Sequence, residues 1–151
     1  VLCHVVLEVV DDPRAALRGV VAVLRPEGLA SVLVAQRYAA VIARAVAGHL
    51  AEARHAVRDP AGRWGTADPL PRRFHEPGVR DLFETADLRV LQVHGVRVLA
   101  DLVPGALSDD PTSARDLLEL EAMVAGHPAF QAVAGQLHVL GTPGRRRRLS
   151  D

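Results

Sequence analysis

The chain has 151 residues, of which 49% are hydrophobic, and its 18 basic side chains balance its 18 acidic ones. This balance excludes a strong overall field for nucleic acid or an acidic membrane, so any polyanion must bind a local patch. The single cysteine, Cys3, excludes an internal disulfide, and no apolar stretch reaches the ~18 residues that span a bilayer, so we expect a cytoplasmic protein.

The first 35 residues predict a strand, a helix and a second strand. Residues 1–6 are a short apolar run, which is typical of a strand buried on both faces of a parallel sheet. Asp12 and Pro13 suit the cap and first turn of a helix, and apolar residues then recur at helical spacing as far as Leu24. Residues 29–35 are the second apolar run. This order predicts a right-handed parallel crossover.

The next 39 or so residues predict helices followed by a long loop. The pattern over 36–57 is helical with a weak point at Gly48, which predicts either two helices or one helix bent there. Residues 58–74 contain repeated Pro and Gly, so they predict an ordered loop. Loops of this length in compact domains are often functional.

Helices and strands alternate in the second half. Residues 76–86 predict a helix, and 88–98 predict a strand that Gly95 interrupts with a bulge or bend. Residues 112–125 predict a further helix, and 128–134 predict a turn or helix.

Residues 136–141 predict the last strand. The polar residues 142–151 predict a tail, whose four consecutive arginines at 145–148 either contact RNA or stay solvated. Neither an internal repeat nor a second domain is visible in the pattern.

The block VLCHVVLEVVDDPRAALRGVVAVLRPEG over 1–28 combines the first strand, an acidic turn, the helix and an RPxG turn. It resembles the fourth strand, the following helix and the start of the fifth strand of class I S-adenosylmethionine-dependent methyltransferases. Further segments are similar to tRNA 5-carboxymethoxyuridine methyltransferases: VAG at 46–48, GVRV at 95–98 with Asp101, LLELE at 117–121 and LHV at 137–139.

The resemblance implies an α/β fold that is the C-terminal part of a Rossmann-like class I methyltransferase. Its strands would be ordered 4-5-7-6, with the last-numbered strand antiparallel. Residues 1–141 would form the C-terminal portion of a single methyltransferase domain, 36–74 the inserted helices and loop over the acceptor site, and 142–151 an Arg-rich flexible tail. The N-terminal cofactor-binding half would be missing, since neither a glycine-rich nucleotide loop nor a ribose-binding acid precedes Val1. We therefore expect a marginally stable fragment that is inactive alone.

The resemblance also implies the cofactor, S-adenosyl-L-methionine, and the residues beside it. Ligands of such sheets lie at the carboxyl ends of the strands. Cys3, His4, Val5 and Leu7, at the end of the first strand, would then border the methionine part of the cofactor.

Methyl transfer to a carboxylate needs orientation and a dry pocket more than acid-base catalysis, because the nucleophile is already an anion. Arg97, in the GVRV segment, is the expected clamp for the acceptor carboxylate. Gln36 and Tyr38 follow the second strand and are expected to position the acceptor. Arg72 and Arg73 in the long loop are expected to contact RNA phosphate. Each of these side chains has a purely structural alternative, either packing or solvation.

The predicted function is methylation of the carboxylate of wobble 5-carboxymethoxyuridine in tRNA by the parent enzyme. Two alternatives remain: a small-molecule methyltransferase of the same fold, since fold alone does not fix function, and an inactive truncated remnant. The sequence contains neither HExxH nor CxxC, so we expect no metal. It leaves the oligomeric state open.

Overall fold

The computed structural model describes residues 1–144. It contains a mixed four-stranded sheet and seven helices. The strands are β1 (Leu2–His4), β2 (Ala30–Ala35), β3 (Leu88–Val96) and β4 (Gln136–Pro143). The helices are α1 (Pro13–Val23), α2 (Arg37–Val46), α3 (Leu50–Arg58), α4 (Glu76–Thr85), α5 (Gly105–Asp109), α6 (Pro111–Val124) and α7 (Pro128–Gln131).

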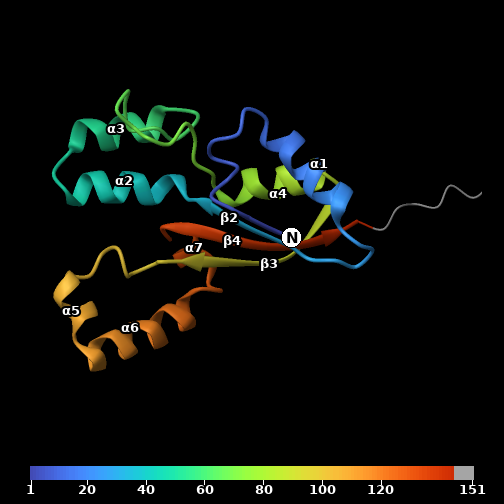
Figure 1. The fold of residues 1–151 in the computed structure, drawn as a ribbon. Helices are drawn as coiled ribbons and strands as arrows, with labels where there is room; N and C mark the ends of the chain where they lie inside the picture. The colour runs from blue at the N-terminus through green and yellow to red at the C-terminus, as the bar shows by residue number, and fades with distance from the viewer. Residues whose placement is uncertain (145–151) are drawn as a thin grey trace, which may run out of the picture.

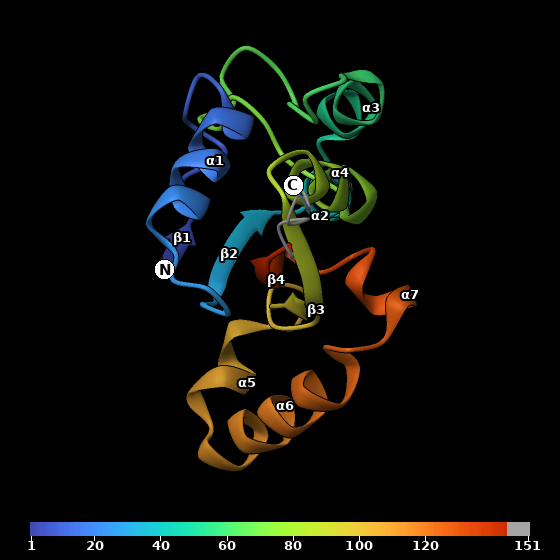
Figure 2. The ribbon, with the colours of Figure 1, turned by 90° about the vertical axis from the view of Figure 1, so that its right-hand side faces the viewer.

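The strands lie in the order β1-β2-β4-β3, which runs from left to right in Figure 2. β1 and β2 are parallel, whereas β4 is antiparallel to both of its neighbours. This arrangement matches the strand order and directions expected from the sequence, and the α/β class is confirmed. The parallel pair requires the α1 crossover, and the carboxyl ends of β1 and β2 therefore lie at the same edge of the sheet.

Helix α1 begins where the sequence predicts, because Asp12 caps it. The Asp12 carboxylate accepts hydrogen bonds from the backbone N–H of Arg14 and Ala15, at 2.8 and 3.0 Å. The Ala15 hydrogen bond is the main cause that lowers the pKa of Asp12. Pro13 occupies the first turn and Leu17 is fully buried, so the helix packs against the sheet through one face.

One face of the sheet is covered by α1 and α4 (Figure 1). Alternate residues of β2 and β4 point into this layer, where they meet Leu17 of α1 and Phe83 of α4. The fully buried members of the core include Leu7, Leu17, Val32, Val34, Val79, Phe83, Leu137 and Val139.

The opposite face of the sheet is only half buried. Ser31 and Leu33 of β2 and His138 and Leu140 of β4 point to this side. Helices α5 and α6 lie on this side of the sheet, below β3 in the views of Figures 1 and 2. None of the described helices is long and apolar enough to cross a membrane.

Several predicted boundaries need correction. The first strand ends at His4 rather than at residue 6, because Val5 adopts φ +55° and turns the chain. The irregularity of β3 lies between Val90 and Gln92, so the prediction of a bulge at Gly95 is wrong. Gly95 serves close packing instead, since a Cβ there would lie 2.9 Å from that of Ala134.

The helical region after β2 consists of two helices, which confirms one of the two predicted alternatives. Gly48 separates α2 from α3 and has φ +80°, a conformation that favours glycine. At the other end of the chain, β4 continues to Pro143, so the predicted tail from 142 begins too early. The arginines at 145–148 lie outside the described residues.

Candidate functional site

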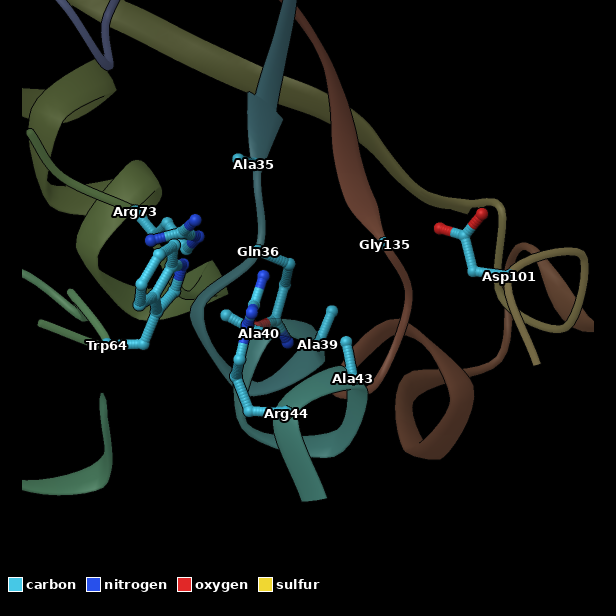
Figure 3. Close-up of a pocket in the computed structure, with 10 residues that line it drawn as sticks. All are labelled: Ala35, Gln36, Ala39, Ala40, Ala43, Arg44, Trp64, Arg73, Asp101 and Gly135. Carbon is cyan, nitrogen blue, oxygen red and sulfur yellow. The ribbon is translucent and has the colours of Figure 1, made fainter. Parts of the chain in front are cut away.

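A groove of about 190 Å³ opens at the carboxyl end of β2 (Figure 3). Ala35 and Gln36 form its floor. Alanines of α2 line one side, where their small side chains leave the groove open. The larger side chains come from α2, from the loop after α3 and from the turn after β3. The lining residues are Ala35, Gln36, Ala39, Ala40, Ala43, Arg44, Trp64, Arg73, Asp101 and Gly135.

A smaller hollow of about 50 Å³ continues the groove towards the end of β3. It shares Ala39, Ala43, Asp101 and Gly135 with the groove and adds Arg97. Two of the three predicted acceptor residues therefore line this depression, Gln36 in the groove and Arg97 in the smaller hollow. Since ligands of α/β sheets bind at the carboxyl ends of parallel strands, this depression is the candidate site.

Gln36 lines the groove, but its side-chain amide forms hydrogen bonds with backbone groups of the protein. The side chain is 2% exposed, and its Nε2 donates to the carbonyls of Gln131, at 3.3 Å, and Ala132. Its Oε1 accepts the backbone N–H of Tyr38 and so caps α2. Gln36 therefore fixes the end of β2 to the segment before β4, which gives the groove a rigid floor.

Tyr38 does not line the groove. Its side chain is 45% exposed, and the Arg37 guanidinium lies 5.7 Å from the centre of its ring. The structure thus brings Gln36 and Arg97 to the depression but leaves Tyr38 outside it.

Arg97 lies in a constrained turn after β3. Its φ is +56°, a left-handed conformation that costs energy for a side chain other than glycine. Its guanidinium pairs with Asp101, and both side chains remain substantially exposed. Gly135 lies against this turn: its N–H donates to the Arg97 carbonyl at 3.0 Å, and a Cβ there would lie 2.8 Å from Asp101 Oδ2.

Glu121 of α6 holds the residues that follow Arg97. Its carboxylate accepts hydrogen bonds from three consecutive backbone N–H groups, those of Val98, Leu99 and Ala100, at 3.0, 2.7 and 2.8 Å. The sequence analysis noted LLELE only as a family-like segment and missed this role. The available signal was that Glu121 shares a helical face with Leu117 and Val124, four residues before it and three after it.

The loop over the groove is fixed by a buried ion pair. Arg73 donates two hydrogen bonds to Asp68, at 2.5 and 3.0 Å, and the two side chains are 10% and 0% exposed. Burial alone would raise the pKa of Asp68, but hydrogen bonds from Arg73 and from the Trp64 and Leu70 amides outweigh it and hold the pKa below its usual range.

The Arg73 guanidinium is therefore already paired with a carboxylate, and the Arg72 guanidinium is also hydrogen-bonded within the protein. Arg72 donates to the carbonyls of Leu7, at 3.1 Å, and Val10, which ties the loop to the turn after β1. Both predicted RNA contacts thus have partners within the protein, and Arg73 is nearly buried.

Arg44 is the groove cation that sequence reasoning missed. Its guanidinium lies 4.2 Å from the centre of the Trp64 ring and 3.3 Å from Glu52. Trp64 lies within the predicted loop 58–74, but nothing in the sequence indicates that an arginine two helical turns into α2 covers its ring. Trp64 and Arg44 together form an aromatic and cationic wall of the groove.

The four residues predicted beside the cofactor separate into two pairs. Cys3 and Leu7 are buried in the core, and burial, followed by the charge of Glu8, raises the pKa of the Cys3 thiol. His4 and Val5 are exposed at the carboxyl end of β1. Only His4 and Val5 are thus open to a ligand through their side chains.

Glu8, which the sequence analysis did not select, connects the ends of β1 and β2. It is fully buried and accepts the Ala35 N–H at 2.5 Å through Oε1. Its Oε2 has no hydrogen-bond partner among the described residues. The carboxylate therefore couples the predicted cofactor segment to the floor of the groove.

A larger cavity of about 990 Å³ lies at the opposite end of the sheet, where β2 begins. Its wall includes Leu24, Glu27 and Arg89 and ends at Gly144, the last described residue. It lies away from the carboxyl ends of the parallel strands, so we favour the smaller groove as the site.

No group of three or more His, Cys, Asp or Glu side chains among residues 1–144 has a geometry that would hold a metal ion. No protein-family model matches the chain, and no curated protein matches it at a significant level.

Proposed function

We propose that the chain is the C-terminal portion of an S-adenosylmethionine-dependent methyltransferase, and that its parent methylates the carboxylate of wobble 5-carboxymethoxyuridine in tRNA. The observation that carries this proposal is the strand order β1-β2-β4-β3, with one parallel pair and an antiparallel β4 between β2 and β3. The sequence resemblance implies this arrangement, which corresponds to strands 4-5-7-6 of the family.

The end of β1 supplies one wall of the proposed cofactor site. His4 and Val5 are exposed there, and the left-handed Val5 turns the backbone outwards, so these two residues fit a ligand wall with Cys3 and Leu7 as its buried support. When bound, S-adenosylmethionine supplies an electrophilic methyl group. We propose that the rest of its site belongs to a cofactor-binding half outside these 151 residues.

The groove is the proposed acceptor site. We propose that an acceptor carboxylate binds Arg97, whose side chain is 60% exposed and pairs with Asp101, and that a base stacks beside the Arg44 guanidinium that covers the Trp64 ring. An acceptor carboxylate needs no general base, because it is deprotonated at neutral pH. The role of these residues is therefore to orient the anion and exclude water.

Deleting the gene for the parent protein tests this function. We expect tRNA from the deletion strain to lose the methyl ester of 5-carboxymethoxyuridine, measured by mass spectrometry of nucleosides, and to regain it on complementation. An unchanged ester would reject the tRNA assignment in favour of another acceptor.

The 151-residue chain alone should not bind the cofactor product. It contains one proposed wall of the site and no glycine-rich nucleotide loop, so too few contacts are available to offset the entropy of binding. Calorimetry with S-adenosylhomocysteine should therefore give no heat of binding at micromolar concentrations. Micromolar affinity would contradict this expectation and would mean that the described strands contain a complete cofactor site.

A further inference from the structure

A row of polar side chains crosses the half-exposed face of the sheet. His4 Nε2 lies 2.9 Å from Ser31 Oγ, which in turn lies 2.7 Å from His138 Nε2. The rings of His4 and His138 are 6.0 Å apart, and His94 stacks on His138 at 6.4 Å. The row therefore connects all four strands, and Ser31 bridges two histidines.

The bridge depends on the protonation of the two rings. Ser31 has one proton to donate, so one histidine can accept it through Nε2 while the other donates its own Nε2–H to Ser31. If both rings are protonated, neither Nε2 can accept the Ser31 proton, although Ser31 Oγ can still accept a hydrogen bond from each ring. Two positive charges then face each other across β2 with ring centres 6.0 Å apart.

Among residues 1–144, no carboxylate lies within ion-pair distance of the three rings to offset this repulsion. The titratable groups that act on His138 are His4 of β1 and His94 of β3, and burial together with these two rings lowers its pKa. None of the ion pairs among the described residues includes His4, His94 or His138. Helices α1 and α4 pack on the other face of the sheet (Figure 1).

β1 is the element that such repulsion would displace. It has only three residues and pairs with one neighbour, β2, over Leu2 to His4. Beyond the ladder, its ends are held by the Val1 amino group on the Leu29 carbonyl and by the Val5 N–H on the Leu33 carbonyl. A short edge strand of this kind opens at little cost.

We propose that His4, Ser31 and His138 form a pH-sensitive latch that holds β1 on the sheet at neutral pH and releases it when both histidines are protonated. Release of β1 would move His4 and Val5, and would strain the Glu8 hydrogen bond that joins the turn after β1 to Ala35. This latch is proposed for the 151-residue chain, in which β1 pairs with β2 alone, and its test does not require the proposed methyltransferase function.

Amide hydrogen exchange of the 151-residue chain, followed by NMR at about pH 7.5 and about pH 5, tests the latch because histidines change charge in this interval. After correction for intrinsic exchange rates, we expect protection of the Val5 amide to fall about tenfold or more at the lower pH, while the amides of β3 and β4 keep theirs. His4→Gln and His138→Gln should each abolish this selective loss, because a neutral side chain remains at one end of the bridge.

His49→Gln is the matched control, since His49 is exposed and its side chain forms no cap hydrogen bond with α3. This variant should lose Val5 protection as the unmodified chain does. Equal loss in β1, β3 and β4 would indicate global unfolding and would overturn the latch, as would unchanged Val5 protection at the lower pH. Selective loss that persists in both His4→Gln and His138→Gln would also overturn it. If one of these two variants does not fold, the other and the unmodified chain still decide the result.

Discussion

Replacing Asp68 with Ala should destabilise the chain by about 3 kcal/mol, because it leaves the Arg73 guanidinium nearly buried without its counter-ion. The substitution also removes the acceptor of the Trp64 and Leu70 N–H groups, at 2.9 and 3.0 Å. Urea unfolding at neutral pH, read by the fluorescence of Trp64, gives both the free energy of unfolding and the state of the loop.

The matched control is Asp81→Ala. Asp81 also pairs with an arginine, Arg14, at 3.2 Å, but the two side chains are 64% and 53% exposed. Exposed ion pairs contribute little, so this change should cost less than about 1 kcal/mol. Equal effects of the two substitutions would show that burial of the Asp68 pair does not stabilise the loop.

The pH dependence of this pair has a definite sign. The folded pKa of Asp68 lies below the ordinary value of 3.8, so the unfolded chain binds the proton more readily. The stabilisation is therefore complete well above pH 3.8 and is lost as the pH falls through 3.8 towards the folded pKa. Asp68→Asn should remove this part of the acid dependence, which unfolding at several acidic pH values would reveal.

Much of the architecture was predictable from the sequence because most elements carry a local signal, although the short helix α5 was not predicted. The apolar runs of β1 and β2 flank a helix with an Asp12 cap, so their parallel pairing follows from the crossover. Gly48 marked the division between α2 and α3 through its left-handed backbone. The order of β4 and β3 came only from the family resemblance, since two antiparallel strands separated by α5 to α7 give no local sign of their position.

The site was less predictable because the partners of a charged side chain are set by tertiary contacts. Arg72 and Arg73 look like free cations in sequence, yet Arg73 pairs with Asp68 and Arg72 with carbonyls more than 60 residues away. Arg44 and Glu8 were missed for the same reason: their importance arises from Trp64 and from the Ala35 N–H. Gly95 was misread because its packing against Ala134 is invisible along the chain.

Glu121 offers the most direct test of how the Arg97 turn is built. Glu121→Ala removes the common acceptor of the Val98, Leu99 and Ala100 N–H groups, so we expect a loss of roughly 2 kcal/mol in the free energy of unfolding. NMR spectra should also show altered amide shifts for Arg97 and for these three residues, because the left-handed Arg97 persists only while its surroundings hold it.

Glu119→Ala is the control on the same helix. Glu119 pairs with Arg115 at 3.2 Å, and the two side chains are 64% and 80% exposed, so its loss should change stability by less than about 0.5 kcal/mol. Glu121→Gln keeps one acceptor oxygen and should fall between Glu121→Ala and the unmodified chain. If Glu121→Ala matched Glu119→Ala in both measurements, α6 would not position Arg97. The turn that contains Arg97 would then have to be held by Gly135 and Asp101 alone.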